Sequence, residues 1–208
     1  FVLFLQGCNF NCLACHNPQT IPLNTPRATE FTVVQVLDQI RESMPYISGV
    51  TVSGGEATVQ YEFVAELFKA IKASEEFKGL STFIDSNGNA PLEVWKQLSP
   101  VTDGVMLDLK SLDNQRHIDL TGSSNETVLE SIKYLSRLGI LYEVRLLLIP
   151  GHNDSDKQLI NTAVWLKGVD PKMRITINAF KTHGVRAAAR DWQEVTDKDM
   201  DRYLGIIS

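Results

Sequence analysis

The sequence predicts an α/β fold, specifically a partial (β/α)6 barrel of the TIM type, with a parallel sheet inside and helices outside. Short apolar runs alternate strictly with amphipathic segments in roughly six β-then-α units, which is the pattern of a parallel sheet covered by helices. The chain has 208 residues, whereas a closed barrel of eight units typically needs about 250. We therefore expect an open barrel, although a doubly wound sheet would produce the same alternation.

The predicted strands are short runs in which apolar residues dominate. Residues 1–5, with the sequence FVLFL, are continuously apolar, and we expect them to form a strand that is buried on both faces. The other predicted strands cover residues 49–53, 80–85, 104–109, 143–149 and 174–180.

The predicted helices carry apolar residues at helical spacing. The stripe of the first helix, over residues 32–44, consists of Val33, Val36, Leu37, Ile40 and Met44. Pro91 stands in the first turn of a helix over 91–98, and Gly139 closes a helix over 125–138. The remaining helices are expected over residues 60–74, 155–166 and from 196 onward.

We interpret residues 1–208 as one domain, because soluble domains usually have about 100–200 residues and no linker or low-complexity segment divides the chain. The chain starts with Phe1 rather than Met and stops within a predicted helix, so we expect a fragment that is incomplete at both ends. The net charge of −5 argues against binding to nucleic acid. No apolar run reaches the roughly 18–20 residues of a membrane span, and no secretory signal is recognisable, so we expect a cytoplasmic protein.

The three cysteines of the chain, Cys8, Cys12 and Cys15, follow the first predicted strand with the spacing C-x3-C-x2-C. An odd, clustered set without a secretory signal indicates metal binding or catalysis rather than disulfides. Three thiolates can ligate three irons of a 4Fe–4S cluster and leave the fourth iron open, whereas ordinary electron-transfer clusters use four. The alternative is a zinc site completed by His16, although zinc ligands usually come as two separated pairs.

This loop resembles the cysteine loop of the radical S-adenosylmethionine superfamily. The strings FLQGC (residues 4–8) and CHNP (residues 15–18) are similar to those of pyruvate formate-lyase activating enzyme and its relatives, and the similarity continues through Gly184. The resemblance implies that the open iron binds the amino and carboxylate groups of S-adenosylmethionine and that electron transfer yields a 5′-deoxyadenosyl radical. It also implies that Ala14 and His16 contact this cofactor.

Gly54, Gly55 and Glu56 follow the second predicted strand. Paired glycines let the backbone approach a ligand closely, and the glutamate offers an acceptor for a cationic amine. A plain strand-to-helix turn is the alternative. The resemblance matches these residues to the segment of the family that binds the amino group of S-adenosylmethionine.

The fourth predicted strand contains Asp108 and ends before Lys110. The period of two places Met106, Asp108 and Lys110 on one face, with Val105, Leu107 and Leu109 on the other. Charged residues on a buried strand are costly unless they are paired or serve a site. The alternatives are an ion pair at the barrel rim or, as the resemblance implies, contacts of Asp108 and Lys110 with S-adenosylmethionine.

Two further positions are candidates for the site. Asp85 and Ser86 end the third strand and are interpreted either as a turn or, by resemblance, as ligands of a monovalent cation, with a carbonyl from Met106. Arg145 lies in an otherwise apolar strand and needs an anionic partner. It is expected either in a core ion pair with Glu143 or Asp108 or, by resemblance, near the cofactor.

The sequence departs from the family after the sixth strand. The family has an aromatic residue and then a histidine that contacts S-adenosylmethionine, whereas this chain has Phe180 and Lys181, with His183 two residues later. Either Lys181 takes the place of this histidine at the cofactor, or His183 reaches across to it. His117 and His152 are expected in surface loops and receive no role.

All these candidates except Arg145 fall at the carboxyl ends of predicted strands, where parallel α/β folds place their sites. The resemblance implies hydrogen abstraction from a glycine of a partner glycyl radical enzyme and an electron donor such as flavodoxin or ferredoxin. The chemistry is then carried by the cofactors, with no separate catalytic residue. The alternatives are a small-molecule substrate or a zinc-stabilised binding domain without catalytic activity.

Overall fold

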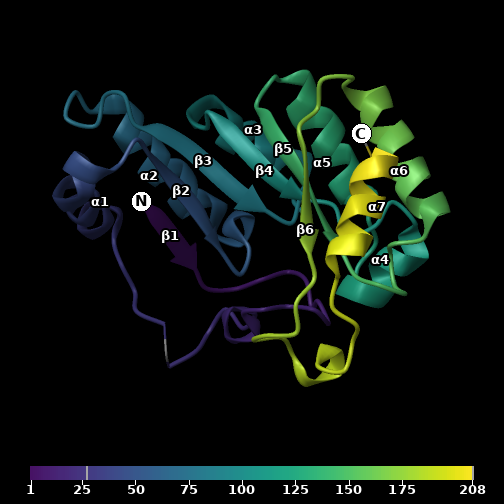
Figure 1. Cartoon of the computed structure of the whole chain (residues 1–208). Coiled ribbons are helices and arrows are strands. Elements are labelled where there is room, and N and C mark those ends of the chain that lie inside the picture. The colour runs from purple at the N-terminus through teal and green to yellow at the C-terminus, as the bar shows by residue number, and fades with distance from the viewer. Residues whose placement is uncertain (27, 208) are drawn as a thin grey trace.

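The computed structural model describes residues 1–26 and 28–207, and within them it contains one six-stranded parallel sheet in the order β1-β2-β3-β4-β5-β6. The strands are β1 (Val2–Leu5), β2 (Gly49–Gly54), β3 (Ser81–Ser86), β4 (Gly104–Asp108), β5 (Leu141–Leu148) and β6 (Ile175–Ala179). Each strand pairs with the next one along the chain (Figure 1). This order rules out a doubly wound sheet, whose strand order reverses at a switch point, and it confirms the partial barrel.

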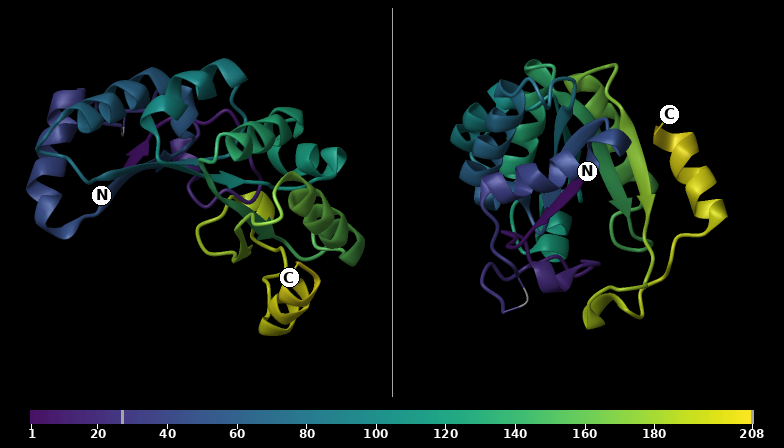
Figure 2. Two further views of the ribbon diagram at one scale, coloured as in Figure 1. Left: turned by 90° about the horizontal axis from the view of Figure 1, so that it is seen from above. Right: turned by 90° about the vertical axis from the view of Figure 1, so that its left-hand side faces the viewer.

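The helices cover the convex side of the curved sheet (Figure 2). They are α1 (Val33–Ser43), α2 (Tyr61–Ala73), α3 (Leu92–Leu98), α4 (Asn114–Thr121), α5 (Glu126–Arg137), α6 (Asp156–Val169) and α7 (Asp197–Ile207). The predicted helices and strands exist, and their ends differ from the prediction by at most three residues. None of the described helices combines the length and the apolar character that crossing a membrane requires.

Helix α4 was not expected from the sequence. It is short and polar, but it is well delimited: the Asp113 side chain accepts a hydrogen bond from Arg116 N (3.0 Å), and Gly122 ends the helix with a φ of +80°. His117 lies in this helix with 0% of its surface exposed, so its assignment to a surface loop is wrong. The other residues of the helix do not show apolar periodicity clearly enough to reveal it in the sequence.

Strand β1 is an edge strand, which corrects the expectation that it is buried on both faces. Val2 and Phe4 are 53% and 67% exposed, and only Leu5 of the strand is buried. In the described part of the chain β1 pairs with β2 alone. Continuous apolar sequence therefore identified the strand correctly but did not report its position at the edge.

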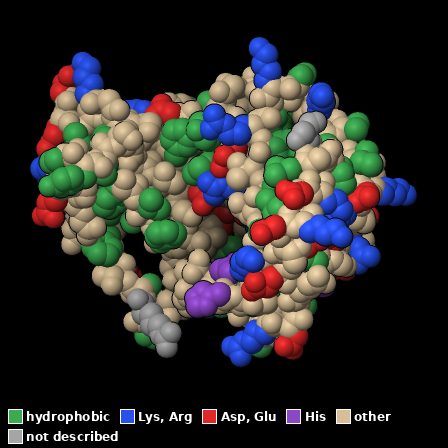
Figure 3. All heavy atoms as spheres, in the orientation of Figure 1, with side chains coloured by type: hydrophobic (Ala, Val, Ile, Leu, Met, Phe, Trp, Pro, Cys, Tyr) green, Lys and Arg blue, Asp and Glu red, His purple; other side chains and the backbone are tan. Residues whose placement is uncertain are grey.

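The hydrophobic core lies between the sheet and the outer helices. In β3, β4 and β5 the helix-facing residues, such as Ile84, Leu107 and Val144, are fully buried, whereas the alternate residues are only partly buried. This confirms the predicted alternation in β4. Charged side chains occupy the opposite, concave face, and Figure 3 shows them gathered with histidines around a hollow between the two edges of the sheet.

Candidate functional site

A cavity of about 230 Å³ brings together the cysteine loop and the carboxyl ends of β2, β3, β4 and β5. Nine of the candidate residues line it: Cys8, Cys12, Ala14, Cys15, His16, Gly54, Gly55, Asp108 and Lys110. They come from the ends of β2 and β4 and from the loop after β1. The fold therefore assembles in one place residues that are about 100 positions apart in the sequence.

The cysteine loop is held by backbone hydrogen bonds at both sides. Cys8 N donates to Ile21 O (2.9 Å), and the N–H groups of Asn11 and Leu13 donate to the carbonyls at the end of α4 (both 2.9 Å). Arg186, from the segment after β6, donates from Nη1 to the carbonyl oxygens of Asn11 and Cys12 (3.0 and 3.2 Å). The loop is thus fixed by its own following segment and by two elements that lie more than 100 residues further along the chain.

The three thiols are free and are only partly exposed. Burial raises the pKa of Cys8, and it raises the pKa of Cys12 to about 11, although the nearby Lys110 ammonium acts in the opposite direction. Each of these two pKa values is raised further by the charge of the neighbouring cysteines. Three thiolates so close together therefore require a cation to compensate their charge, which a metal or metal cluster supplies.

A 4Fe–4S cluster fits this donor set better than zinc does. All three sulfurs line one cavity whose wall is otherwise free of cysteine, which suits three-point ligation with one open position. Across residues 1–26 and 28–207, no three His, Cys, Asp or Glu side chains are arranged closely enough to hold a single metal ion. His16, the fourth ligand of the zinc alternative, already has Nε2 2.9 Å from the carbonyl oxygen of Lys181.

Gly54 and Gly55 allow β2 to pack on the cysteine loop. A Cβ at Gly54 would lie 2.1 Å from Leu5 O, and one at Gly55 would lie 2.3 Å from Gly7 O. Gly54 also has a φ of +125°, which other residues rarely adopt. The first requirement for these glycines is therefore a close approach between two backbone segments, while their backbone also lines the cavity.

The Glu56 carboxylate lies behind these glycines rather than in the cavity. It is 1% exposed and accepts hydrogen bonds from Thr58 N, Thr58 Oγ1 and Ser86 Oγ on Oε1 (2.9, 2.7 and 2.8 Å) and from Asn87 N on Oε2 (2.6 Å). Burial raises the pKa of Glu56, and the four hydrogen bonds oppose this. All four donors are neutral. Because two of them belong to Thr58, after β2, and two to Ser86 and Asn87, at the end of β3, the glutamate joins the ends of these two strands.

Asp108 and Lys110 form an ion pair at the wall of the cavity, with 2.7 Å between Nζ and Oδ2. Their side chains are 28% and 18% exposed. Burial disfavours the charged ammonium, but Asp108 and the Cys12 sulfur outweigh it, so the pKa of Lys110 is raised. The pair thus presents one carboxylate and one permanent cation to any ligand of the cavity.

A second ion-pair network lies on the concave face of β3 and β5, outside the lining of the cavity. Arg145 pairs with Asp85 (2.9 Å) and Glu143 (2.6 Å) and donates to the Met106 sulfur. Asp85 also accepts from Ser53 Oγ (2.9 Å). The core ion pair with Glu143 is therefore present, whereas Asp108 is the register partner of Arg145 without a direct bond.

Lys181 and His183 lie on the loop after β6, and neither lines the cavity. The Lys181 side chain is 57% exposed, and its Nζ donates to Val195 O (3.2 Å) and pairs with Glu194 (3.3 Å). His183 is exposed. What this loop contributes to the cavity is the Lys181 carbonyl that contacts His16.

Two asparagines in the lining were not identified from the sequence. Asn87 contacts the cysteine loop, and Asn153 braces the rim: its Nδ2 donates to Lys110 O (2.7 Å) and Leu147 O (2.8 Å), while Oδ1 accepts from Ile149 N (2.8 Å). Both residues follow strand ends, which is the one signal in the sequence that could have found them.

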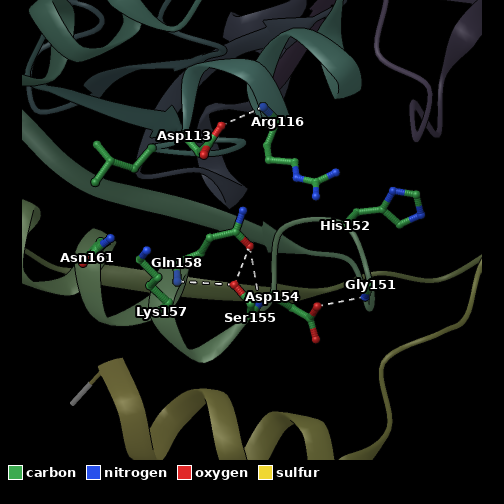
Figure 4. A pocket seen from close by; sticks show the side chains of 10 residues that line it. Asp113, Arg116, Gly151, His152, Asp154, Ser155, Lys157, Gln158 and Asn161 are labelled. Atoms are coloured by element: carbon green, nitrogen blue, oxygen red, sulfur yellow. Dashed lines mark hydrogen bonds between the residues drawn. The ribbon is translucent and has the colours of Figure 1, made fainter.

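A second, polar pocket of about 490 Å³ lies beside this rim, between the N-termini of α4 and α6 (Figure 4). Asp113 and Ser155 line it and already cap the two helices. His152 lies in a loop, as expected, but it is half-buried and stacks on Trp192 with 3.9 Å between the ring centroids. Burial and the charge of Arg116 lower the pKa of His152.

Comparison with known proteins supports the interpretation of the main cavity. The family model of the Radical SAM superfamily matches residues 2–163. The chain is 37% identical to a pyruvate formate-lyase-activating enzyme of Streptococcus mutans over 88% of the chain and 72% of that protein, and 34% identical to one of Staphylococcus epidermidis over 89% and 76%.

A solved structure agrees with the fold. The crystal structure of Streptococcus suis SuiB bound to the precursor peptide SuiA superposes with a TM-score of 0.73 at 18% identity, over 98% of this chain and 44% of that one. At this identity the likeness concerns the fold alone.

Proposed function

The chain belongs to the radical SAM superfamily, and from this premise we propose that it is an activating enzyme that abstracts a hydrogen atom from a glycine of a partner glycyl radical enzyme. The observation that carries the proposal is the meeting of Cys8, Cys12 and Cys15 with the Asp108–Lys110 pair in one cavity. The relatives named pyruvate formate-lyase-activating enzyme, at 31–37% identity over most of the chain, support a protein substrate.

The cysteines, the ion pair and the glycines of the cavity have defined tasks in this proposal. A 4Fe–4S cluster with S-adenosylmethionine supplies, when bound, the reductive cleavage that generates the hydrogen-abstracting 5′-deoxyadenosyl radical. Cys8, Cys12 and Cys15 hold the cluster. Asp108 and Lys110 match the two charges of an amino acid moiety, and Gly54 and Gly55 form part of the cavity wall without a side chain that would fill it.

The remaining residues that we assign to S-adenosylmethionine are Ala14, His16, Glu56, Arg145 and Lys181. Ala14 and His16 line the cavity. Glu56 and Arg145 act through the residues that they hold: Glu56 through Asn87, and Arg145 through Asp85. For Lys181 we propose a contribution through its carbonyl oxygen on His16.

A monovalent cation at Asp85, Ser86 and Met106 is part of the proposal. Asp85 and Met106 are register partners in β3 and β4, which brings a carboxylate and a backbone carbonyl to the same level of the sheet. The cation would share Asp85 with Arg145, and Ser86 would contribute its backbone, because its hydroxyl donates to Glu56. Activity that rises with added K⁺ or Na⁺ in wild type but not in Asp85→Asn would support this site.

The reaction also needs one electron from outside the chain. We propose a small redox protein such as flavodoxin or ferredoxin as the donor, and the cytoplasm as the location. Replacing chemical reductant by reduced flavodoxin in the assay below tests this part alone.

Anaerobic reconstitution tests the main proposal. We expect about four irons and four sulfides per chain, and 5′-deoxyadenosine together with a glycyl radical signal when the glycyl radical enzyme is supplied. Cys12→Ser should lose the cluster but retain the fold, whereas Lys167→Ala, on the exposed side of α6, should behave as wild type. Stable binding of one zinc per chain without iron would contradict the proposal. Conversion of a small metabolite without a glycyl radical signal would contradict the protein substrate and indicate a small-molecule substrate instead.

A further inference from the structure

We propose that Asn87 is a positioning residue that donates a hydrogen bond to the Cys8 sulfur and thereby raises the reduction potential of the bound cluster. The inference rests on the proposed function, because it requires the cluster. The inference concerns Cys8 alone among the three cysteines. Within the described residues the hydrogen bonds to a cysteine sulfur go to Cys8, from Phe10 N at 3.4 Å and from Asn87 Nδ2 at 3.8 Å.

The orientation of the Asn87 amide is fixed by its other partners. Oδ1 accepts a hydrogen bond from Asn89 N (2.8 Å), and Nδ2 donates to Asn9 Oδ1 (2.8 Å). Asn9 is itself oriented, since its Nδ2 donates to Asn89 O (2.6 Å). If the Asn87 amide were flipped, its NH₂ group would face the Asn89 N–H and its oxygen would face two acceptors, so the NH₂ group must point at Cys8.

The position of Asn87 is fixed by Glu56. The buried carboxylate accepts the Asn87 N–H on Oε2 at 2.6 Å and holds the preceding Ser86 hydroxyl on Oε1 at 2.8 Å. Ser86 Oγ in turn accepts from Gly88 N at 3.0 Å, which closes the turn. Because Asn87 is buried and all its side-chain polar atoms are engaged, the amide has no alternative arrangement within this turn.

The effect on the cluster follows from electrostatics. A hydrogen-bond donor directed at a ligand sulfur stabilises negative charge there, and the reduced cluster carries one more negative charge than the oxidised one. Hydrogen bonds to the sulfurs are among the factors that set cluster potentials. The Asn87 amide therefore favours the reduced form that the proposed reaction needs.

The test compares the same substitution at two neighbouring asparagines. Asn87→Leu removes the donor to the Cys8 sulfur. Asn89→Leu is the control, because Asn89 takes part in the network through its backbone N–H and carbonyl oxygen, which the substitution retains. Asn87→Ser is a second variant that is too short to reach the sulfur and less disruptive to packing. Each variant is reconstituted anaerobically, its iron content is measured, and the reduced cluster is titrated by electron paramagnetic resonance without partner protein.

We expect Asn87→Leu and Asn87→Ser to retain iron but to show a roughly three- to tenfold lower ratio of reduced to oxidised cluster at a fixed potential. Tenfold corresponds to about 59 mV for a one-electron couple. Asn89→Leu should titrate as wild type. Equal potentials for all variants with full iron content would overturn the inference while leaving the proposed function intact, and so would loss of iron in both Asn87 variants. A wild-type chain that binds no cluster would overturn both.

Discussion

Carboxylates occur in two regions of the molecule, at the joined ends of β2 and β3 and on the concave face of β3–β5. The protein stabilises the carboxylates of the two regions in opposite ways. Glu56, at the first location, is almost completely buried and accepts four hydrogen bonds from neutral donors. Asp108 and Asp85, at the second, are each 28% exposed and are paired with Lys110 and Arg145.

This difference indicates that Glu56 belongs to the structural framework of the site, whereas Asp108 belongs to its binding surface. A buried carboxylate surrounded by neutral donors cannot release them without leaving several polar groups unsatisfied, so it fixes the turn that it holds. A partly exposed ion pair next to a cavity can exchange one partner for a charged ligand at little cost, because water compensates. We therefore expect substitutions at Glu56 to act mainly on folding and substitutions at Asp108 to act mainly on affinity.

The largest effect is expected for Glu56→Ala. It leaves four buried donors without an acceptor, and we expect the free energy of unfolding to fall by about 3–4 kcal/mol. Urea unfolding measures this, with Glu66→Ala on the exposed side of α2 as the control. A variant of wild-type stability with weakened binding of S-adenosylmethionine would instead place the carboxylate in the cavity.

Asp108→Ala should show the reverse balance. The loss of a charged partner for the cofactor should weaken S-adenosylmethionine binding about 10- to 100-fold, which corresponds to about 1.4–2.7 kcal/mol. Stability should change by less than about 1 kcal/mol. Equilibrium dialysis of reconstituted protein and urea unfolding measure the two quantities, with the exposed Asp119→Ala as control. Lower stability with unchanged affinity would make this pair structural.

Arg145→Gln should be intermediate and should depend on pH. Burial acts to raise the pKa of Glu143, but hydrogen bonds from Arg145 and Thr176 outweigh burial and keep this pKa below its usual 4.5. A depressed carboxyl pKa contributes stability above the unfolded pKa that is lost as the pH falls through the folded one. The variant should thus be about 1–2 kcal/mol less stable at pH 7, with a deficit that shrinks below about pH 4.5. A deficit that does not change with pH would contradict this.

The smallest effect is expected for Lys181→Ala. Because the side chain is exposed and bonds only within its own loop region, S-adenosylmethionine affinity should change less than about twofold, and the melting temperature should remain near that of wild type. A loss of affinity comparable to that of Asp108→Ala would show that the ammonium turns into the cavity. Arg190→Ala, at an exposed position in the same segment between β6 and α7, serves as the control.

The sequence by itself determined what depends on local periodicity and spacing. Alternating strand and helix patterns predicted six parallel units in an open barrel, and the period of two in 104–109 separated Asp108 from the buried Leu107 correctly. The cysteine spacing favoured a 4Fe–4S cluster over zinc, and the resemblance of the loop to the radical S-adenosylmethionine superfamily indicated the chemistry. These properties are encoded in residues that are close in sequence, so one chain without its structure suffices to recognise them.

Only the tertiary structure decided where the side chains point and what they hold. Glu56 turns away from the cavity toward Ser86 and Asn87, which lie some 30 residues later and supply two of its four donors. Asn87 in turn reaches Cys8 across 79 positions. β1 is exposed because it lies at the edge of the sheet. Such outcomes depend on which donors and neighbours the fold brings within hydrogen-bonding distance, and no local pattern in the sequence carries that information.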